Sequence, residues 1–223
     1  MAALRRPLAA EALGSFFLFA TVVGSGIMAE RLSGGNVAVA LLGNSVATGA
    51  MLFVLITMLA PISGAHFNPA VTLVMWLRKD LKAKAALAFM AVQVAGGILG
   101  VWMTHLIFDD AVVQFSDKAR TGLGQWTGEF IATFGLVLTI LGTLRTRPQA
   151  VPVSVALYIT AAYWFTSSTS FANPAITVAR SLSNSFAGIS SADVAPFIAA
   201  QVLGALAALL VAKQILEVSD LEQ

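Results

Sequence analysis

Two long stretches of this chain carry no Asp, Glu, Lys or Arg, and they constrain its fold more than any other feature. They cover residues 32–77 and 148–179. The whole chain has thirteen basic and eleven acidic side chains, and 58% of its 223 residues are hydrophobic. A soluble domain has about 25% charged residues, which help to cover its surface. The composition therefore excludes a soluble enzyme, a disordered tail and a nucleic-acid binder, and predicts a protein integral to the lipid bilayer.

The apolar runs are long enough for several membrane spans, each of which needs about 20 residues. Two further segments, 69–78 and 174–184, are too short to cross the membrane. Each begins at a proline, which is favoured in the first turn of a helix, so we expect re-entrant half-helices there. The six predicted transmembrane helices lie near residues 8–28, 37–60, 85–108, 126–145, 151–168 and 194–213.

The basic residues predict the orientation. Arg5 and Arg6 precede the first apolar run, as in a signal peptide. However, Glu11 interrupts that run and no A-x-A-like site follows closely, so we expect a retained span. With the N-terminus inside, most basic residues lie on the cytoplasmic side, as the positive-inside rule requires. The sequence thus predicts a multi-pass protein with both termini cytoplasmic, and its short termini favour a bacterial inner (plasma) membrane.

The chain contains an internal repeat. Each half has three predicted spans, with a half-helix between the second and the third. Because the number of crossings per repeat is odd, the second copy is inverted, and such proteins have their working site near the midplane. We interpret residues 1–223 as one channel domain, with repeats at about 1–108 and 122–216 and an external connecting loop at about 109–121. The matching segments are AEALGSFFLF (10–19) with GEFIATFGLV (128–137), NPAVTLV (68–74) with NPAITVA (173–179), and QVAGG (93–97) with QVLGA (201–205).

The two Asn-Pro-Ala motifs lie at matching positions of this repeat. Asn68 and Asn173 are placed to cap the half-helices, whose first backbone N–H groups are unpaired and carry partial positive charge. Two such ends meeting in the membrane repel cations, and the Asn amides can donate hydrogen bonds to a neutral solute. Irregular backbone at this depth is tolerated only where it lines a cavity. A single motif would fit a simple turn, but two at matching positions favour a pore. The motif residues are Asn68, Pro69, Ala70, Asn173, Pro174 and Ala175.

On these motifs the chain resembles the aquaporin and aquaglyceroporin (major intrinsic protein) family over nearly its whole length. The resemblance implies an all-α membrane protein with the aquaporin-like fold, in which six transmembrane helices and two re-entrant half-helices form an inverted 3+3 repeat. It also implies a homotetramer in which each subunit has its own pore for small uncharged solutes. The segments that carry it are SGAHFNPAV (63–71), FANPA (171–175), AEALGSFF (10–17), GEFIATF (128–134), Gln93 and Gln201.

The resemblance also assigns roles to residues. Glu11 and Glu129 would accept hydrogen bonds from the half-helix loops, because a buried carboxylate without such donors is very costly. His66 is expected to face the cytoplasmic half of the pore. It has no metal partner, since the other histidine, His105, lies far along the third span. We expect no metal, no cofactor and no catalytic residue. The backbone carbonyls implied to line the pore belong to Gly64, Ala65, His66, Thr169, Ser170 and Phe171.

The chain departs from the family pattern at one position of the pore constriction. In most relatives an arginine follows the second motif, whereas Ile176 stands here. Family spacing maps the other three positions to Thr48, Ala161 and Ser170. This set has no charge and no aromatic ring, which predicts a wide, mildly amphipathic constriction. Arg180 lies about 6 Å further along the helix and about 40° around it. An ion pair or a charge in the external vestibule is therefore expected there, rather than a role in the selectivity filter.

These residues predict a passive channel for water, glycerol-like polyols, urea-like amides and neutral metalloid hydroxides such as arsenite. The bacterial relatives that this chain resembles in lacking the arginine are associated with metalloid efflux. An ordinary water-selective aquaporin is one alternative, and a structural tetramer is another. An ion-coupled secondary transporter is a third, although it would need an ion ligand at the midplane, where Glu11 and Glu129 already have a structural role. No enzyme is expected, because no catalytic set converges on the pore.

Overall fold

The computed structural model describes residues 4–216, and the regular structure of this range is helical, without a strand. Residues 1–3 and 217–223 lie outside the described range. The prediction that both termini are cytoplasmic concerns these residues. The helices are α1 (Arg5–Leu32), α2 (Val37–Ser63), α3 (Pro69–Leu77), α4 (Ala83–Ile107), α5 (Leu123–Thr146), the short 3₁₀ helix η2 (Pro148–Ala150), α6 (Val151–Phe165), α7 (Pro174–Arg180) and α8 (Ser191–Ile215).

Five helices in the described range are long and apolar enough to cross a membrane, namely α1, α2, α4, α5 and α8. The sixth predicted span is shorter than expected. Helix α6 has 15 residues, a rise of about 22 Å, and η2 precedes it directly. It ends at Phe165 rather than 168 because Thr166 leaves the helical conformation, with φ −111° and ψ 137°. Likewise α7 ends at Arg180 rather than 184, where the chain turns.

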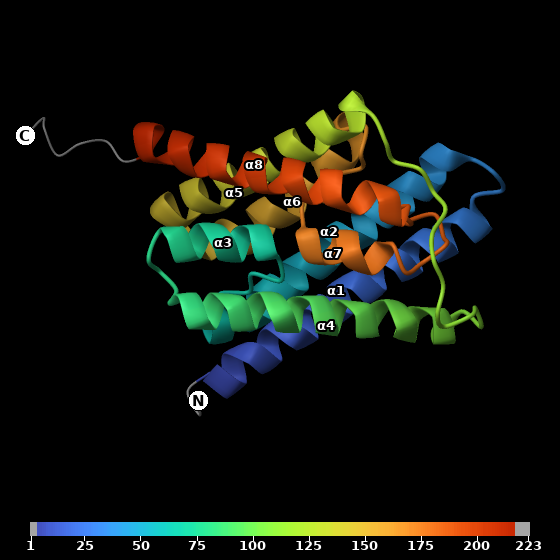
Figure 1. Cartoon of the computed structure of the whole chain (residues 1–223), viewed down its shortest axis with the longest axis horizontal. Coiled ribbons are helices and arrows are strands. Elements are labelled where there is room, and N and C mark those ends of the chain that lie inside the picture. The colour runs from blue at the N-terminus through green and yellow to red at the C-terminus, as the bar shows by residue number, and fades with distance from the viewer. Residues whose placement is uncertain (1–3, 217–223) are drawn as a thin grey trace, which may run out of the picture.

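The helices pack as two equivalent sets. Helix α1 packs against α2 and α4, and α5 packs in the same way against α6 and α8. Contacts between α2 and α6 join the two sets. In Figure 1, the half-helices α3 and α7 lie end to end between α4 and α8, and each contacts both of these long helices. This arrangement places the two short helices inside the bundle.

Glycines allow the closest helix contacts in both sets. A Cβ on Gly96 of α4 would lie 2.3 Å from the carbonyl oxygen of Ala12 in α1. A Cβ on Gly204 of α8 would lie equally close, 2.3 Å, to the carbonyl oxygen of Phe130 in α5. Small residues let the backbones of membrane helices approach and gain packing contacts. The repeat therefore extends to the helix interfaces.

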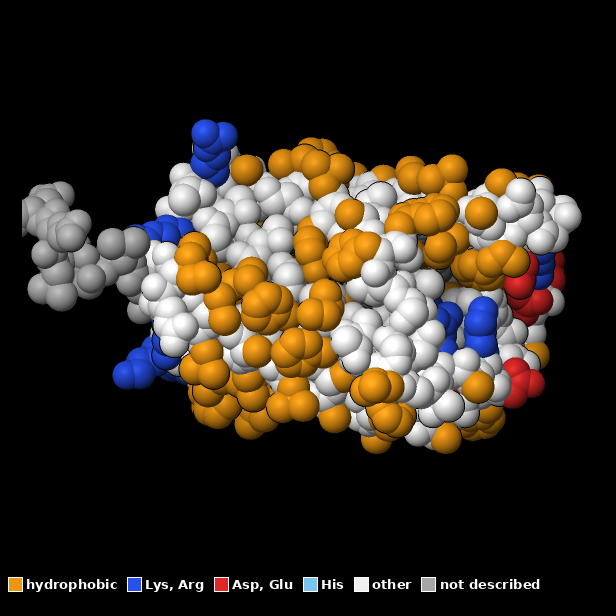
Figure 2. All heavy atoms as spheres, turned by 90° about the horizontal axis from the view of Figure 1, so that it is seen from above, with side chains coloured by type: hydrophobic (Ala, Val, Ile, Leu, Met, Phe, Trp, Pro, Cys, Tyr) orange, Lys and Arg blue, Asp and Glu red, His pale blue; other side chains and the backbone are white. Residues whose placement is uncertain are grey.

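The bundle has two ends of different charge. We call the end where α1 begins and α8 ends the terminal face, and the opposite end, which carries residues 108–122, the loop face. In Figure 2, Lys and Arg gather at the terminal face, while Asp and Glu gather at the loop face with further basic side chains. Hydrophobic side chains are exposed between the two ends. A belt of this kind suits contact with lipid.

Candidate pore and its constriction

The two half-helices begin at capped, proline-containing ends. The side-chain oxygen of Asn68 accepts a hydrogen bond from Ala70 N at 2.9 Å, and that of Asn173 accepts one from Ala175 N at 3.0 Å. Both Asn residues have extended backbone, which is typical of an N-cap. Pro69 follows the first cap as the first helical residue, where its missing N–H leaves no acceptor unpaired.

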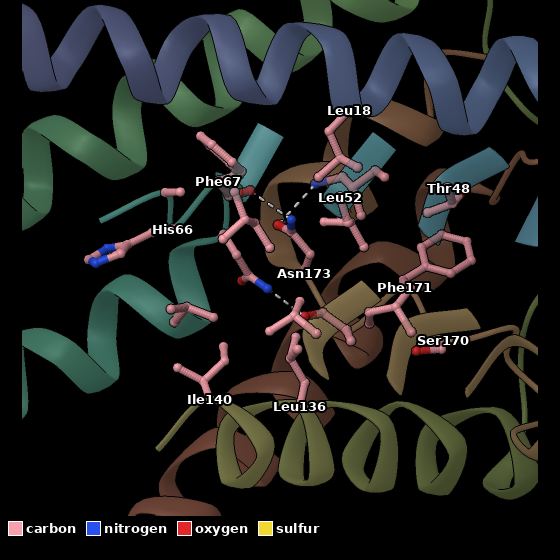
Figure 3. A pocket seen from close by; sticks show the side chains of 18 of the residues that line it. Leu18, Thr48, Leu52, His66, Phe67, Leu136, Ile140, Ser170, Phe171 and Asn173 are labelled. Atoms are coloured by element: carbon pink, nitrogen blue, oxygen red, sulfur yellow. Dashed lines mark hydrogen bonds between the residues drawn. The ribbon is translucent and has the colours of Figure 1, made fainter. Parts of the chain in front are cut away.

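The asparagine amides also join the two loops at the centre of the bundle. Asn68 Nδ2 donates to the carbonyl of Ala172 at 2.7 Å, and Asn173 Nδ2 donates to the carbonyl of Phe67 at 2.8 Å; Figure 3 shows both bonds as dashed lines. An amide nitrogen has two hydrogens. Since each bond uses only one of them, the second can be offered to a solute in the cavity, whose wall includes Asn68 and Asn173.

The carboxylate of Glu11 holds the first loop. Its side chain has no solvent exposure. Its oxygens accept hydrogen bonds from the Ser63 hydroxyl (2.6 Å), His66 N (3.0 Å), Phe67 N (2.7 Å) and Gln93 Nε2 (2.7 Å). Such charge-assisted bonds offset the cost of burying a carboxylate. Because the loop N–H groups point toward Glu11, other loop polar groups are left to face the cavity.

Glu129 holds the second loop in the same way and is also fully buried. It accepts bonds from Phe171 N and Ala172 N, both at 2.8 Å, and from Gln201 Nε2 at 2.6 Å. Two carboxylates whose oxygens are occupied by loop donors are suited to a structural role. Nothing in this arrangement favours the coupling-ion ligand that a secondary transporter would need.

Two threonines complete these networks and were missed by the sequence reasoning. Gln93 Nε2 donates to Thr72 Oγ1 at 3.0 Å, and Gln201 Nε2 donates to Thr177 Oγ1 at 2.9 Å. Each threonine hydroxyl in turn donates to the carbonyl of the capping Asn, at 3.0 and 2.8 Å. The repeat contained the necessary signal, since NPAVT and NPAIT place a threonine at the same distance from Asn.

The loop backbones are strained. Four residues without a glycine's freedom have positive φ in matching pairs: Ala65 (52°) with Ser170 (51°), and Phe67 (49°) with Ala172 (48°). Left-handed conformations of such residues cost free energy and persist only where surrounding contacts enforce them, here the bonds to the two glutamates. Of the residues whose carbonyls were expected in the pore, the cavity wall includes Gly64, Ala65, His66, Ser170 and Phe171 but not Thr169.

A cavity of about 840 Å³, its open ends included, runs past both motifs. Figure 3 shows His66 toward one end, Asn173 in the middle, and Thr48, Ser170 and Phe171 toward the other. Much of the remaining wall is aliphatic, including Leu18, Leu52, Leu136 and Ile140. A polar strip facing an apolar wall suits small neutral solutes that have both hydroxyl groups and hydrocarbon surface.

Three of the four residues expected at the constriction lie in this wall: Thr48, Ser170 and Ile176. The structure corrects the fourth. Ala161 lies on the exposed side of α6, and Tyr163 lines the cavity instead. Its hydroxyl lies 3.2 Å from Thr48 Oγ1.

The physical reason is helix rotation. Two residues along a helix correspond to about 200°, so Ala161 and Tyr163 point to nearly opposite sides. The pattern of α6 contained a signal for this difference, because Val151, Val155, Ile159 and Tyr163 follow one another at intervals of four and all line the cavity. The aromatic ring of Tyr163 therefore lies in the cavity wall beside Thr48, where the sequence predicted none.

The structure also places Arg180. Among residues 4–216 no carboxylate lies within ion-pair distance of it, so the expected ion pair is not formed. Instead its side chain is part of the cavity wall, with Cζ 3.3 Å from the centre of the Phe171 ring. The cavity wall therefore carries a positive charge at Arg180, although the side chain at position 176 is uncharged.

The two histidines lie apart. His66 Nδ1 lies 3.1 Å from Thr72 Oγ1 at the cavity. The side chain of His105, in α4, instead contacts the carbonyl of Val112 at 2.8 Å and the hydroxyl of Ser183 at 2.9 Å. His105 thus fixes the chain beyond α7 to α4. Across the part of the chain that the structure describes, no group of His, Asp and Glu is arranged to hold a metal ion.

Comparisons with known proteins agree with this geometry. The model of the family "Major intrinsic protein" matches residues 1–170. The chain is 52% identical over 214 residues to the aquaglyceroporin AqpS of Rhizobium meliloti (strain 1021), covering 96% of this chain and 91% of that protein. It is 29% identical over 168 residues to aquaporin Z of Photorhabdus laumondii, covering 68% and 72%.

A solved structure shows the same fold. The aquaglyceroporin from Plasmodium falciparum superimposes with a TM-score of 0.68 at 19% identity, covering 95% of this chain and 96% of that one. The all-α architecture with two half-helices, expected from the repeat, is thereby confirmed. Together with the family match and the bacterial relative, this leads to one conclusion: the chain belongs to the major intrinsic protein family.

Proposed function

We propose that this chain forms a passive channel for small uncharged solutes, with a pore that admits molecules larger than water. The observation that carries the proposal is the continuous cavity in which both asparagines of the motifs meet a mostly aliphatic wall. A channel of this kind binds its solute weakly and has no covalent step, which fits a family of pores rather than of enzymes.

The proposed constriction is formed by Thr48, Tyr163, Ser170 and Ile176. The Tyr163 hydroxyl lies against Thr48, so one side of the constriction is fixed by this pair. The hydroxyl of Ser170 is buried and has no hydrogen-bond partner in the described range, and Ile176 adds aliphatic surface. This combination supports passage of solutes that carry hydroxyl groups on a small apolar body.

Glycerol fits this description, and so does arsenite, which is the neutral hydroxide As(OH)₃ at neutral pH. Urea has no hydroxyl group, but it is small and uncharged and its amide groups form hydrogen bonds, so we propose it as a further solute. The relative AqpS is named an aquaglyceroporin, which supports polyol permeation, and we propose that water also passes. We further propose a homotetramer with one pore per subunit in a bacterial inner (plasma) membrane. The exposed aliphatic side chains of α1, α2, α5 and α6 support both contacts with lipid and contacts between subunits.

The test is a comparison of glycerol, arsenite and water flux in proteoliposomes that contain the purified protein. We expect glycerol and arsenite to pass much faster than through empty vesicles. Permeation by water alone would contradict the proposal in favour of a water-selective pore, whereas saturable uptake driven by an ion gradient would indicate a transporter. Absence of any flux would indicate a structural role.

A substitution tests the constriction itself. Ile176→Arg should lower glycerol and arsenite flux at least tenfold, because a guanidinium narrows the opening. Ile176→Val, which keeps an aliphatic side chain, is the matched control and should stay within twofold of the unmodified protein. Unchanged glycerol flux in a folded Ile176→Arg protein would show that Ile176 does not lie at the constriction.

A further inference from the structure

Arg180 is the only Lys or Arg among the described residues that line the cavity. It ends α7, and it is among the largest fully buried side chains, with 2% of its surface exposed. A charged side chain buried to this degree normally has an ionic partner. Nothing of this kind lies within ion-pair distance of Arg180 in residues 4–216, so its charge requires another explanation.

Two contacts fix the guanidinium group. Its Nε donates a hydrogen bond to the carbonyl of Ala187, and its carbon Cζ lies 3.3 Å from the centre of the Phe171 ring. The terminal nitrogens Nη1 and Nη2 have no hydrogen-bond partner within residues 4–216. They are not among the buried atoms of the described range that lack a partner, and Arg180 lines the cavity. We therefore expect these donors to be met by whatever fills the cavity, either water or the oxygen atoms of a solute.

A second arginine, Arg120, also lies near the Phe171 ring, but its contacts are those of a structural residue. The Cζ of Arg120 lies 4.8 Å from the centre of the Phe171 ring. However, Arg120 donates from Nε to the carbonyl of Gly188 at 2.8 Å and from Nη1 to that of Ser168 at 3.1 Å. It does not line the cavity. Arg120 thus supports the second loop, whereas Arg180 keeps its donors for the cavity.

Helix geometry explains how Arg180 acts near Ile176. Residues four apart on a helix lie on the same face, one above the other. Ile176 and Arg180 both line the cavity, so the wall of α7 is aliphatic at one level and cationic one turn further toward the loop face. In this pore, selection by size at Ile176 and selection by charge at Arg180 then take place at two separate levels.

We propose that Arg180 is the residue by which this pore rejects cations, in place of an arginine at position 176. The inference rests on the proposed channel function. Its fixed positive charge lies in a confined, mostly aliphatic passage, where charges are screened much less than in water. Neutral solutes pass because they carry no charge for Arg180 to repel, whereas K⁺ meets a fixed positive charge that no ion pair neutralises within residues 4–216.

The experiment measures K⁺ flux and glycerol flux in the same proteoliposomes for the unmodified protein, Arg180→Gln and Arg180→Lys. We expect Arg180→Gln to raise K⁺ flux at least tenfold while glycerol flux stays high, which shows that the pore is folded and open. Arg180→Lys keeps the charge, so its K⁺ flux should stay within about threefold of the unmodified protein. The matched control is Arg31→Gln, which removes an exposed cation from the loop face and should leave both fluxes unchanged.

Several results would overturn the inference. One is an Arg180→Gln protein that conducts glycerol and excludes K⁺ as well as the unmodified protein does. Another is an equal K⁺ leak in Arg180→Lys or in Arg31→Gln, because charge at this position would then not be the cause. An unmodified protein that conducts glycerol but also conducts K⁺ would overturn it without any substitution. If the unmodified protein conducts no glycerol at all, the proposed function itself fails.

Folding of the variants is monitored by gel filtration and thermal unfolding in detergent. Should Arg180→Gln fail to reconstitute, Arg180→Met replaces it, because the methionine stem can still pack on Phe171 without carrying a charge. The expected result is the same tenfold rise in K⁺ flux. A folded Arg180→Met protein that excludes K⁺ would overturn the inference.

Discussion

In the first repeat, the loop before α3 presents His66 to the cavity, whereas the matching position before α7 is Phe171. The Nδ1 atom of His66 lies within hydrogen-bond distance of Thr72 Oγ1. Phe171 is instead held by the two arginines near its ring, Arg120 and Arg180, and by an edge contact with Phe197 whose ring centres are 5.2 Å apart. The two ends of one pore thus differ in the side chains that a solute meets.

The backbone of the two loops shows no such difference. Both have a buried glutamate that accepts two successive backbone N–H groups, a glutamine that bonds this glutamate, and a threonine that bonds the glutamine. The comparison teaches that the polar network determines the path of the loop, while the side chains that face the cavity vary independently. Selectivity in this protein is therefore expected at the positions that the repeat does not preserve.

The largest effects are expected from the glutamates. Glu11→Ala and Glu129→Ala each leave several buried donors without an acceptor and should destabilise the fold by about 3–5 kcal/mol, measured by thermal unfolding in detergent. Glu11 has one donor more than Glu129, the Ser63 hydroxyl. Glu11→Gln should therefore cost about 1 kcal/mol more than Glu129→Gln.

The control for the glutamates is Glu30→Ala, since Glu30 is exposed and its removal should change stability by less than about 0.5 kcal/mol. If Glu129→Ala unfolds at the same temperature as the unmodified protein while Glu11→Ala does not, the two networks are not equivalent.

A smaller effect is expected from the threonines. Thr177→Val removes bonds to Gln201 and Asn173 and should cost about 1–2 kcal/mol. Thr72→Val removes the matching bonds and also frees His66, so it should cost more and should alter glycerol flux as well. Thermal unfolding and flux measurements distinguish the two variants. Thr57→Val, at an exposed threonine within α2, serves as control; equal losses in all three would argue against the networks.

The smallest effect concerns the charges of the loop face. Burial, together with the nearby Arg120 and Arg180, lowers the pKa of Lys118 to about 8. Because the unfolded chain then binds more protons between about pH 8 and pH 10, the free energy of unfolding should rise slightly over this range. Lys118 is partly exposed, so solvent screening keeps the effect small.

The measurement is the unfolding temperature between pH 7 and pH 9.5. Lys118→Met should flatten this dependence. Lys84→Met removes an exposed lysine of the terminal face and should leave the dependence as it is. A slope that persists unchanged in Lys118→Met would exclude Lys118 as its source. The pKa of Arg120, lowered by burial to about 10, affects stability only above this range.

The sequence predicted the elements that the repeat encodes twice. The half-helices, their capping asparagines and the places of Glu11 and Glu129 follow from matching segments, because a feature that occurs in both copies stands out from chance. The same logic would have found Thr72 and Thr177. Comparison of the two repeats could not find features that occur only once. Examples are Tyr163 of α6 in the cavity wall and the two arginines that lie near the ring of Phe171.

The sequence by itself thus determined that this chain crosses a membrane, that it folds as an inverted repeat and that its half-helices meet inside it. Scarcity of charge, proline-initiated short segments and repeated motifs are local properties that a sequence displays directly. Only the tertiary structure decided which face of α6 lines the cavity and that the Arg180 side chain reaches it. Both depend on helix rotation and side-chain reach at angstrom scale, which the packing of neighbouring helices sets. The spacing of four in α6 marks one face of that helix, but the sequence does not say that this face lines the cavity.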